Sequence, residues 1–148
     1  MTRTSWTLMM GWCWVVTAFG AVLMGSAFAA SDAPTRVLLG LLAGEAPTLD
    51  APLRFAAGLT GAVTFGWGLT VLAIASLAHR LEPSVARALW RRIAAALAAW
   101  FVVDSAISAA TGFALNAVSN TALVAAFFLM AWRMGVFASA APSDAVPA

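Results

Sequence analysis

The chain consists of long apolar runs that are separated by short polar or charged stretches. Four runs contain the roughly 20 residues that a helix needs to cross the hydrocarbon core of a membrane. They cover residues 6–30, 53–78, 93–115 and 116–136. The pattern predicts an all-α fold: a polytopic membrane protein with a four-transmembrane-helix bundle, formed by residues 1–137.

Signals for shorter elements lie between and after these spans. Ser31 or Asp32 can cap a helix that Pro34 begins and that ends near Gly44. This helix is too short to span, so we expect it to lie in the membrane interface. The third and fourth spans are so close in sequence that they must form a tight antiparallel hairpin. Residues 138–148 lack an apolar stripe and are predicted to be disordered.

The first span has two interpretations. It resembles a secretory signal sequence, with small residues from Ala27 to Ala29 at the cleavage position. Against cleavage, only one arginine, Arg3, precedes the apolar run, and removal would leave three spans. We therefore expect an uncleaved first helix.

The composition agrees with a membrane location. Hydrophobic residues make up 63% of the chain and charged residues 9%, whereas soluble domains carry about 25% charged residues. The net charge is +2, and the basic residues are scattered between the spans, which does not favour a nucleic-acid partner. The single cysteine, Cys13, can form neither an intramolecular disulfide nor a thiolate metal site, and we expect it to be inert.

Arginine placement predicts the orientation, because cytoplasmic loops carry an excess of Arg and Lys. With four spans, one side of the membrane carries Arg3, Arg80, Arg87, Arg91, Arg92 and Arg133, and the other carries Arg36 and Arg54. We therefore expect both termini to be cytoplasmic. The cluster between the second and third spans is predicted to contact acidic lipid headgroups through Arg80, Arg87, Arg91 and Arg92.

One carboxylate, Asp104, lies inside the third span. A charged side chain at the centre of a bilayer costs roughly 2.5 to 3.5 kcal/mol on insertion scales, so it needs partners. Helical spacing places Asp104, Ser108 and Thr111 on one face, with Ser105 at its edge. This polar stripe should point into the bundle.

Arg54 is the cation predicted to meet it. On the second span, Arg54 shares a face with Gly58, Gly61 and Gly68, whose small size permits close helix packing. The central structural hypothesis is an ion pair between Arg54 and Asp104. The remaining hydrogen bonds would come from Ser105, Ser108, Asn116 or Asn120. In the alternative hypothesis, Asp104 titrates or binds a ligand, with Trp67 and Trp100 lining a small apolar cavity or simply packing.

The remaining chemistry gives little support for catalysis. The only histidine, His79, lies at the end of the second span, where it is expected to cap the helix. It does not favour a haem or pigment within the bilayer, and no metal site or cofactor is predicted beyond a bound lipid or quinone. No reaction is indicated, which favours a protein that is not an enzyme.

The stretches "LRFAAGLTGAVTFGWG", "WFVVDSAISAATG" and "NAVSNTALVAAFFL" together resemble small four-helix bacterial inner-membrane proteins, similar to biphenyl-operon X-like proteins. The resemblance covers roughly the last three spans. It implies that Arg54, Gly58 and Asp104 belong to the polar core of such a bundle. It implies no substrate.

Two functions of different classes fit the sequence. The first is an accessory or structural subunit that packs against a larger membrane complex, with other membrane subunits or itself as partner. Its docking face would be the first helix, which carries Gly11, Gly20 and Gly25. The second is a binder or carrier of a small lipophilic molecule, such as a quinone, lipid or aromatic compound, near Asp104.

Overall fold

The structure, a computed structural model, describes residues 3–45 and 47–138, and within them it is all-α. The elements are α1 (Arg3–Met24), the 3-10 turn η1 (Gly25–Ala27), α2 (Ala33–Ala43), α3 (Ala51–Ala78), α4 (Pro83–Ala110) and α5 (Ala114–Arg133). Four segments are long and apolar enough to cross a membrane: Thr4–Ala27, Ala51–Ala78, Pro83–Ala110 and Ala114–Arg133. The predicted four-helix membrane bundle is confirmed. The disorder predicted for the C-terminal tail falls, from residue 139 onward, outside the described residues.

Local signals in the sequence set the ends of these helices. Pro34 lies in the first turn of α2, and Gly44 ends that helix with a φ of 88°, a left-handed conformation that glycine adopts without strain. Gly112 does the same after α4, with a φ of 87°, and the next helix begins at Ala114. The predicted tight hairpin between the third and fourth spans is thus present.

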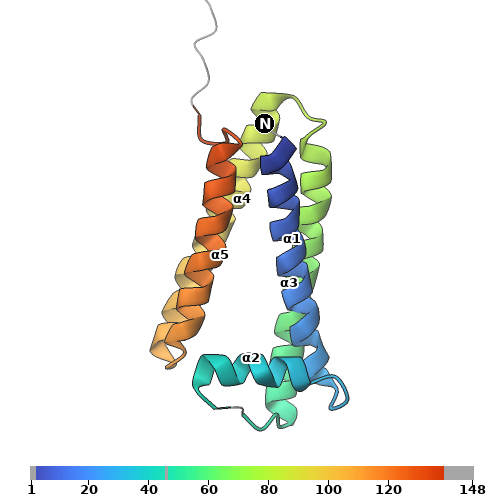
Figure 1. Ribbon diagram of the computed structural model, residues 1–148, viewed down its shortest axis with the longest axis vertical. Helices are drawn as coiled ribbons and strands as arrows, with labels where there is room; N and C mark the ends of the chain where they lie inside the picture. The colour runs from blue at the N-terminus through green and yellow to red at the C-terminus, as the bar shows by residue number, and fades with distance from the viewer. Residues whose placement is uncertain (1–2, 46, 139–148) are drawn as a thin grey trace, which may run out of the picture.

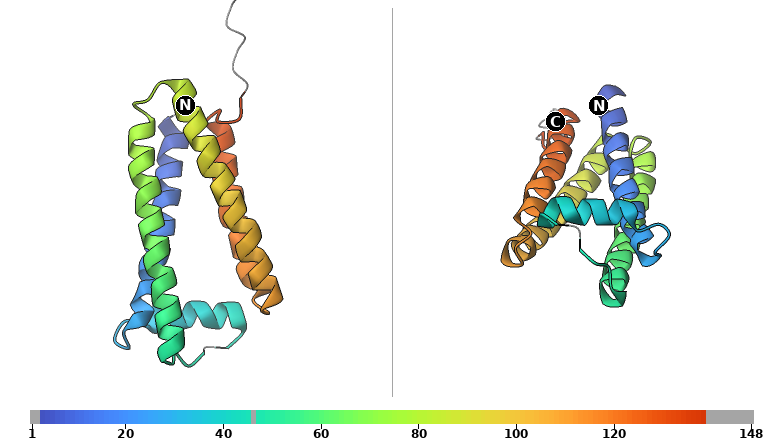
Figure 2. Two further views of the ribbon diagram at one scale, coloured as in Figure 1. Left: turned by 180° about the vertical axis from the view of Figure 1, so that it is seen from behind. Right: turned by 60° about the horizontal axis from the view of Figure 1, so that its bottom comes forward.

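The long helices form two pairs. Helix α1 packs along α3, and α4 packs along α5 (Figure 1). The two pairs come together at the end where the N-terminus and the loop from α3 to α4 lie, and they separate toward the other end. There α2 lies across the ends of the long helices, as Figure 2 also shows. The short helix predicted for the interface therefore bridges the separated ends of the two pairs.

Glycines allow α1 and α3 to touch through their backbones. A Cβ added at Gly61 would lie 2.6 Å from the carbonyl carbon of Leu23, and one at Gly20 would lie 2.7 Å from the Cα of Phe65. One at Gly68 would lie 2.9 Å from the Cα of Thr17. Because real Cβ contacts are not this short, only glycine fits at these places.

The buried core fills the end where the two pairs converge. Its fully buried side chains include Met9 on α1, Trp90 and Leu97 on α4, and Phe127 on α5. Trp90 is only 1% exposed, because the converging helices enclose it.

A chain of aromatic contacts joins all four long helices near this core. Centroid distances are 6.4 Å from Trp100 to Trp67, 6.2 Å from Trp67 to Trp12, 5.1 Å from Trp12 to Phe127 and 6.2 Å from Phe127 to Trp90. The indole of Trp12 also donates a hydrogen bond of 2.9 Å to the carbonyl of Leu123. Since helix α4 supplies both ends of this chain, the contacts tie the two pairs together.

Replacing Gly61 by Ala should destabilise the protein, because the new methyl group meets the backbone of α1. Overpacking of this kind costs about 1–3 kcal/mol. The matched control is Gly66→Ala on the same helix, where nothing lies within 4 Å of the added Cβ. The free energy of unfolding in detergent, measured by denaturant titration, should fall for Gly61→Ala and stay near wild type for Gly66→Ala. Equal stabilities would contradict the backbone contact.

Candidate functional site

Arg54 pairs with Asp32, not with Asp104 as the sequence predicted. Its Nη2 lies 2.6 Å from Oδ2 of Asp32, and its Nη1 donates a hydrogen bond of 3.0 Å to the carbonyl of Ser26. The predicted ion pair between the second and third spans is therefore wrong. The side chain of Asp32 makes no capping hydrogen bond to the start of α2, so its expected role as a side-chain cap is replaced by the ion pair with Arg54.

The glycine face of α3 explains this difference. Arg54, Gly58 and Gly61 do share a face, as predicted, but that face is turned toward α1 and η1. A Cβ added at Gly58 would lie 3.1 Å from the Cβ of Ala27. An ion pair near the end of the helices also keeps part of its hydration, since Arg54 is 23% exposed, whereas a pair at Asp104 would lose more.

Asp104 is held instead by amide and hydroxyl groups. Its Oδ1 accepts hydrogen bonds of 3.0 Å from Asn116 Nδ2, 2.8 Å from Asn120 Nδ2 and 3.2 Å from the hydroxyl of Ser108. Asn116 also donates to the hydroxyl of Ser108, at 2.8 Å. The structure thus brings together four of the predicted polar residues, and these hydrogen bonds join α4 to α5. We call Asp104, Ser108, Asn116 and Asn120 the polar clasp.

The polar clasp lies at membrane depth. Asp104 precedes the end of α4 by six residues, or about 9 Å at 1.5 Å per residue. Asn120 and Ser108 are buried, whereas Asp104 and Asn116 are half-buried. Donors on three side chains satisfy Oδ1 of Asp104, which lowers the cost of placing this carboxyl group at membrane depth without a cation beside it.

Oδ2 of Asp104 and the hydroxyl of Ser105 have no hydrogen-bond partner among the described residues. All three hydrogen bonds to the carboxylate end on Oδ1 of Asp104, which leaves Oδ2 without a donor. The hydroxyl oxygen of Ser105, also predicted to belong to the polar core, is buried and has no partner. The region therefore keeps hydrogen-bonding capacity that the fold does not use.

Trp67 and Trp100 come together, as the hypothesis of a lined cavity required. Their rings are stacked at 30°, and both side chains are half-buried. Trp100 lies one helical turn before Asp104, on the same face of α4. Their contact contributes packing between α3 and α4, and their partial exposure leaves aromatic surface beside the polar clasp.

The four arginines predicted to contact lipid headgroups differ in exposure and in hydrogen bonding. Arg80 and Arg92 are exposed. Arg91 donates hydrogen bonds of 2.7 Å each to the carbonyls of Val136 and Ala138, so it fastens the chain that follows α5. Arg87 is half-buried. Glu82, which precedes α4, has a lowered pKa because the hydroxyl and backbone N–H of Ser84 donate to its carboxylate.

No motif in the sequence identifies Asp32 as the partner of Arg54. The sequence pattern indicates only a capping role for Asp32, although Asp32 lies on the same predicted side of the membrane as Arg54. That shared side was a usable signal, because an acid near the membrane surface meets an arginine at lower desolvation cost than Asp104 does.

Searches of protein-family models, curated proteins and solved structures find no match to the chain. The resemblance to biphenyl-operon X-like proteins therefore stays a prediction that rests on residues alone.

A double-mutant cycle should locate the partner of Arg54. The pair Arg54→Gln and Asp32→Asn should show a coupling energy of about 0.5–3 kcal/mol, as expected for residues in contact. The pair Arg54→Gln and Asp104→Asn should be additive, because Asp104 bonds to α5 instead. Free energies of unfolding in detergent measure both cycles. Coupling in the second cycle without coupling in the first would restore the ion pair predicted from the sequence.

Proposed function

We propose that this multi-pass membrane protein binds a small lipophilic molecule beside Asp104. The molecule would carry a hydroxyl or amine group, because a carboxylate oxygen accepts hydrogen bonds. A quinol or an aromatic amine has this chemistry, whereas the carbonyls of an oxidised quinone offer only acceptors. The proposal thus narrows the binder or carrier function predicted from the sequence to ligands that can donate a hydrogen bond.

The observation that supports the proposal is Oδ2 of Asp104, which has no donor among the described residues. Ionisable side chains inside a membrane mark functional sites by default, since their insertion is costly. The structural explanation for Asp104, its pairing with Arg54, no longer applies because Arg54 binds Asp32. The hydrogen bonds of the polar clasp position the carboxylate, and the second oxygen is left for a ligand.

The neighbouring groups suit an amphipathic ligand. The hydroxyl of Ser105 is buried and also lacks a hydrogen-bond partner among the described residues. Trp100 lies one helical turn from Asp104 and stacks on Trp67, so the two rings offer aromatic surface beside the carboxylate. Small-molecule sites combine apolar surface with a few fixed polar groups in this way.

Asp104→Asn is the variant that tests this function, because it keeps the shape of the side chain and removes its charge. Native mass spectrometry of protein released gently from native membranes should show one defined small molecule on the wild type. Loss of a charge-assisted hydrogen bond should reduce its retention about tenfold or more. Glu45→Gln, an exposed acid in the loop after α2, is the matched control and should retain the molecule.

Two results would contradict the proposal. In one, the wild type carries no defined small molecule. In the other, Asp104→Asn retains the molecule as well as Glu45→Gln does. Melting temperatures of both variants show whether the protein has kept its fold.

An accessory-subunit function is the second candidate, and Trp14 favours it. Trp14 lies in the middle of α1, is 59% exposed and has no hydrogen-bond partner among the described residues. Tryptophan normally lies at the membrane interfaces, where its N–H finds an acceptor. Gly11, one turn away, leaves open space beside it. A partner helix on this face would cover both residues, and native mass spectra with larger subunits attached would support it.

We also propose a location: a bacterial inner membrane, as the resemblance implies, with both termini in the cytoplasm, as the arginines indicate. Membership in a group of small four-helix proteins similar to biphenyl-operon X-like proteins is part of the same proposal. Four helices that are long and apolar enough to cross a membrane support the membrane location.

Cysteine labelling should reveal this orientation. In a Cys13→Ser background, a membrane-impermeant thiol reagent should label Thr48→Cys in intact cells whose outer membrane is permeable to it. Ser84→Cys, at the arginine-rich end, should react only after the inner membrane is opened. Thr48 and Ser84 are both exposed, so access to the side chain is comparable. The opposite pattern would reverse the topology.

A further inference from the structure

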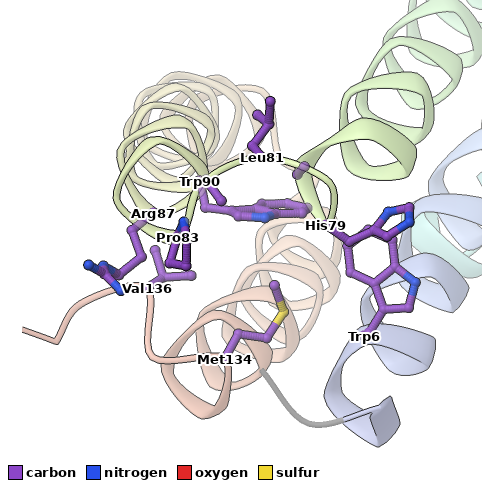
Figure 3. A pocket seen from close by; sticks show the side chains of 10 residues that line it. Trp6, His79, Leu81, Pro83, Arg87, Trp90, Met134 and Val136 are labelled. Atoms are coloured by element: carbon purple, nitrogen blue, oxygen red, sulfur yellow. The ribbon is translucent and has the colours of Figure 1, made fainter.

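A pocket of about 400 Å³ lies at the arginine-rich end of the bundle (Figure 3). It is lined by Trp6 of α1, His79 at the end of α3, Arg87 and Trp90 of α4, and Met134 and Val136 after α5. It therefore draws on α1, α3, α4 and the chain that follows α5, and lies at the opposite end from the polar clasp. None of the residues of the polar clasp lines it.

Trp90 supplies a buried donor that lacks an acceptor. Its side chain is 1% exposed, and its Nε1–H has no hydrogen-bond partner among the described residues. Buried N–H groups in folded proteins are almost always paired, so an unpaired one in the wall of a pocket needs an explanation. An acceptor that occupies the pocket would provide it.

Arg87 supplies the positive charge. It is half-buried and donates no hydrogen bond to the residues that the structure describes, whereas Arg91 is committed to the carbonyls of Val136 and Ala138. The carboxylate of Glu82 attracts the guanidinium of Arg87 electrostatically but forms no hydrogen bond or ion pair with it in the described part of the chain, so the N–H donors of Arg87 remain available to an anion. The nearest acid in sequence, Glu82, does not line the pocket, and its carboxylate accepts hydrogen bonds from Ser84.

The rest of the wall is largely apolar, and His79 stands at the side with its ring 5.3 Å from that of Trp6. An indole N–H and a guanidinium beside apolar side chains suit a phosphate attached to a hydrophobic body. Helix ends that carry arginine and tryptophan lie at the level of lipid headgroups. We infer that this pocket binds the phosphate group of an anionic phospholipid, whose acyl chains extend along the helices.

Met134 lines the pocket together with Trp90. Figure 3 shows its side chain directed toward the ring of Trp90, and it is 5% exposed. Because the unbranched thioether changes rotamer easily, it can move aside when a headgroup enters. The phosphate then accepts a hydrogen bond from Nε1 of Trp90 and binds the guanidinium of Arg87.

Lipid titration followed by native mass spectrometry tests this inference. Purified full-length protein in detergent receives phosphatidylglycerol, and in parallel phosphatidylcholine, inorganic phosphate or glycerol phosphate. We expect one tightly held phosphatidylglycerol per chain and weaker retention of the zwitterionic lipid. Trp90→Phe and Arg87→Gln should each weaken binding about tenfold, as loss of a hydrogen bond to a charged group does.

Two matched control variants show whether any loss of binding comes merely from removing a positive charge or a tryptophan. Arg92→Gln removes an exposed arginine five residues away on the same helix, and Trp132→Phe removes a tryptophan that is 68% exposed. Neither residue lines the pocket, so both variants should bind as the wild type does. Asp104→Asn should also leave this binding intact, which separates the inference from the ligand proposed at the polar clasp.

Three results would overturn the inference. One is unchanged binding in both Trp90→Phe and Arg87→Gln, and another is an equal loss in their controls. The third is binding of inorganic phosphate or glycerol phosphate with the same dependence on Arg87 while phosphatidylglycerol is not retained, which would identify a free anion as the ligand. Melting temperatures show whether each variant has folded, and Arg87→Gln, a change at a partly exposed side chain, decides the question if Trp90→Phe does not fold.

Discussion

The backbone contact between α1 and α3 is the constraint on which the rest of the structure depends. Gly20, Gly61 and Gly68 let the two helices approach until no Cβ would fit between them. In a membrane, where lipid tails are as apolar as the side chains, such close packing replaces the hydrophobic effect as the source of helix association. The glycine face of α3 is thereby committed to α1.

The partners of Arg54 and Asp104 follow from this packing of α3 against α1. Arg54 lies on the same face of α3, so it meets the chain that follows α1 and binds Asp32 and the carbonyl of Ser26. This interaction fixes the start of α2 across the ends of the helices. Asp104 is left to α5, where Asn116 and Asn120 supply donors in place of a cation. Arg54 and Asp32 thus have a structural role, whereas Oδ2 of Asp104 has no donor among the described residues.

The two ends of the bundle consequently differ in character. At the arginine-rich end, buried aromatic side chains such as Trp90 and Phe127 pack the two pairs together. At the other end the pairs separate, the polar clasp joins α4 to α5, and α2 bridges the gap in the fold (Figure 1). A ligand beside Asp104 and a lipid beside Trp90 would thus occupy opposite membrane leaflets and act independently.

The sequence by itself determined the elements that depend on local chemistry. Apolar run length defined the four spans, Pro34 and Gly44 defined α2, and helical spacing placed Asp104 and Ser108 on one face. Only the tertiary structure decided which faces meet. Periodicity shows that the glycines of α3 share a face, but small residues fit any neighbouring helix equally well. The partner of Arg54 and the burial of Trp90 depend on that choice of neighbour, which no local pattern encodes.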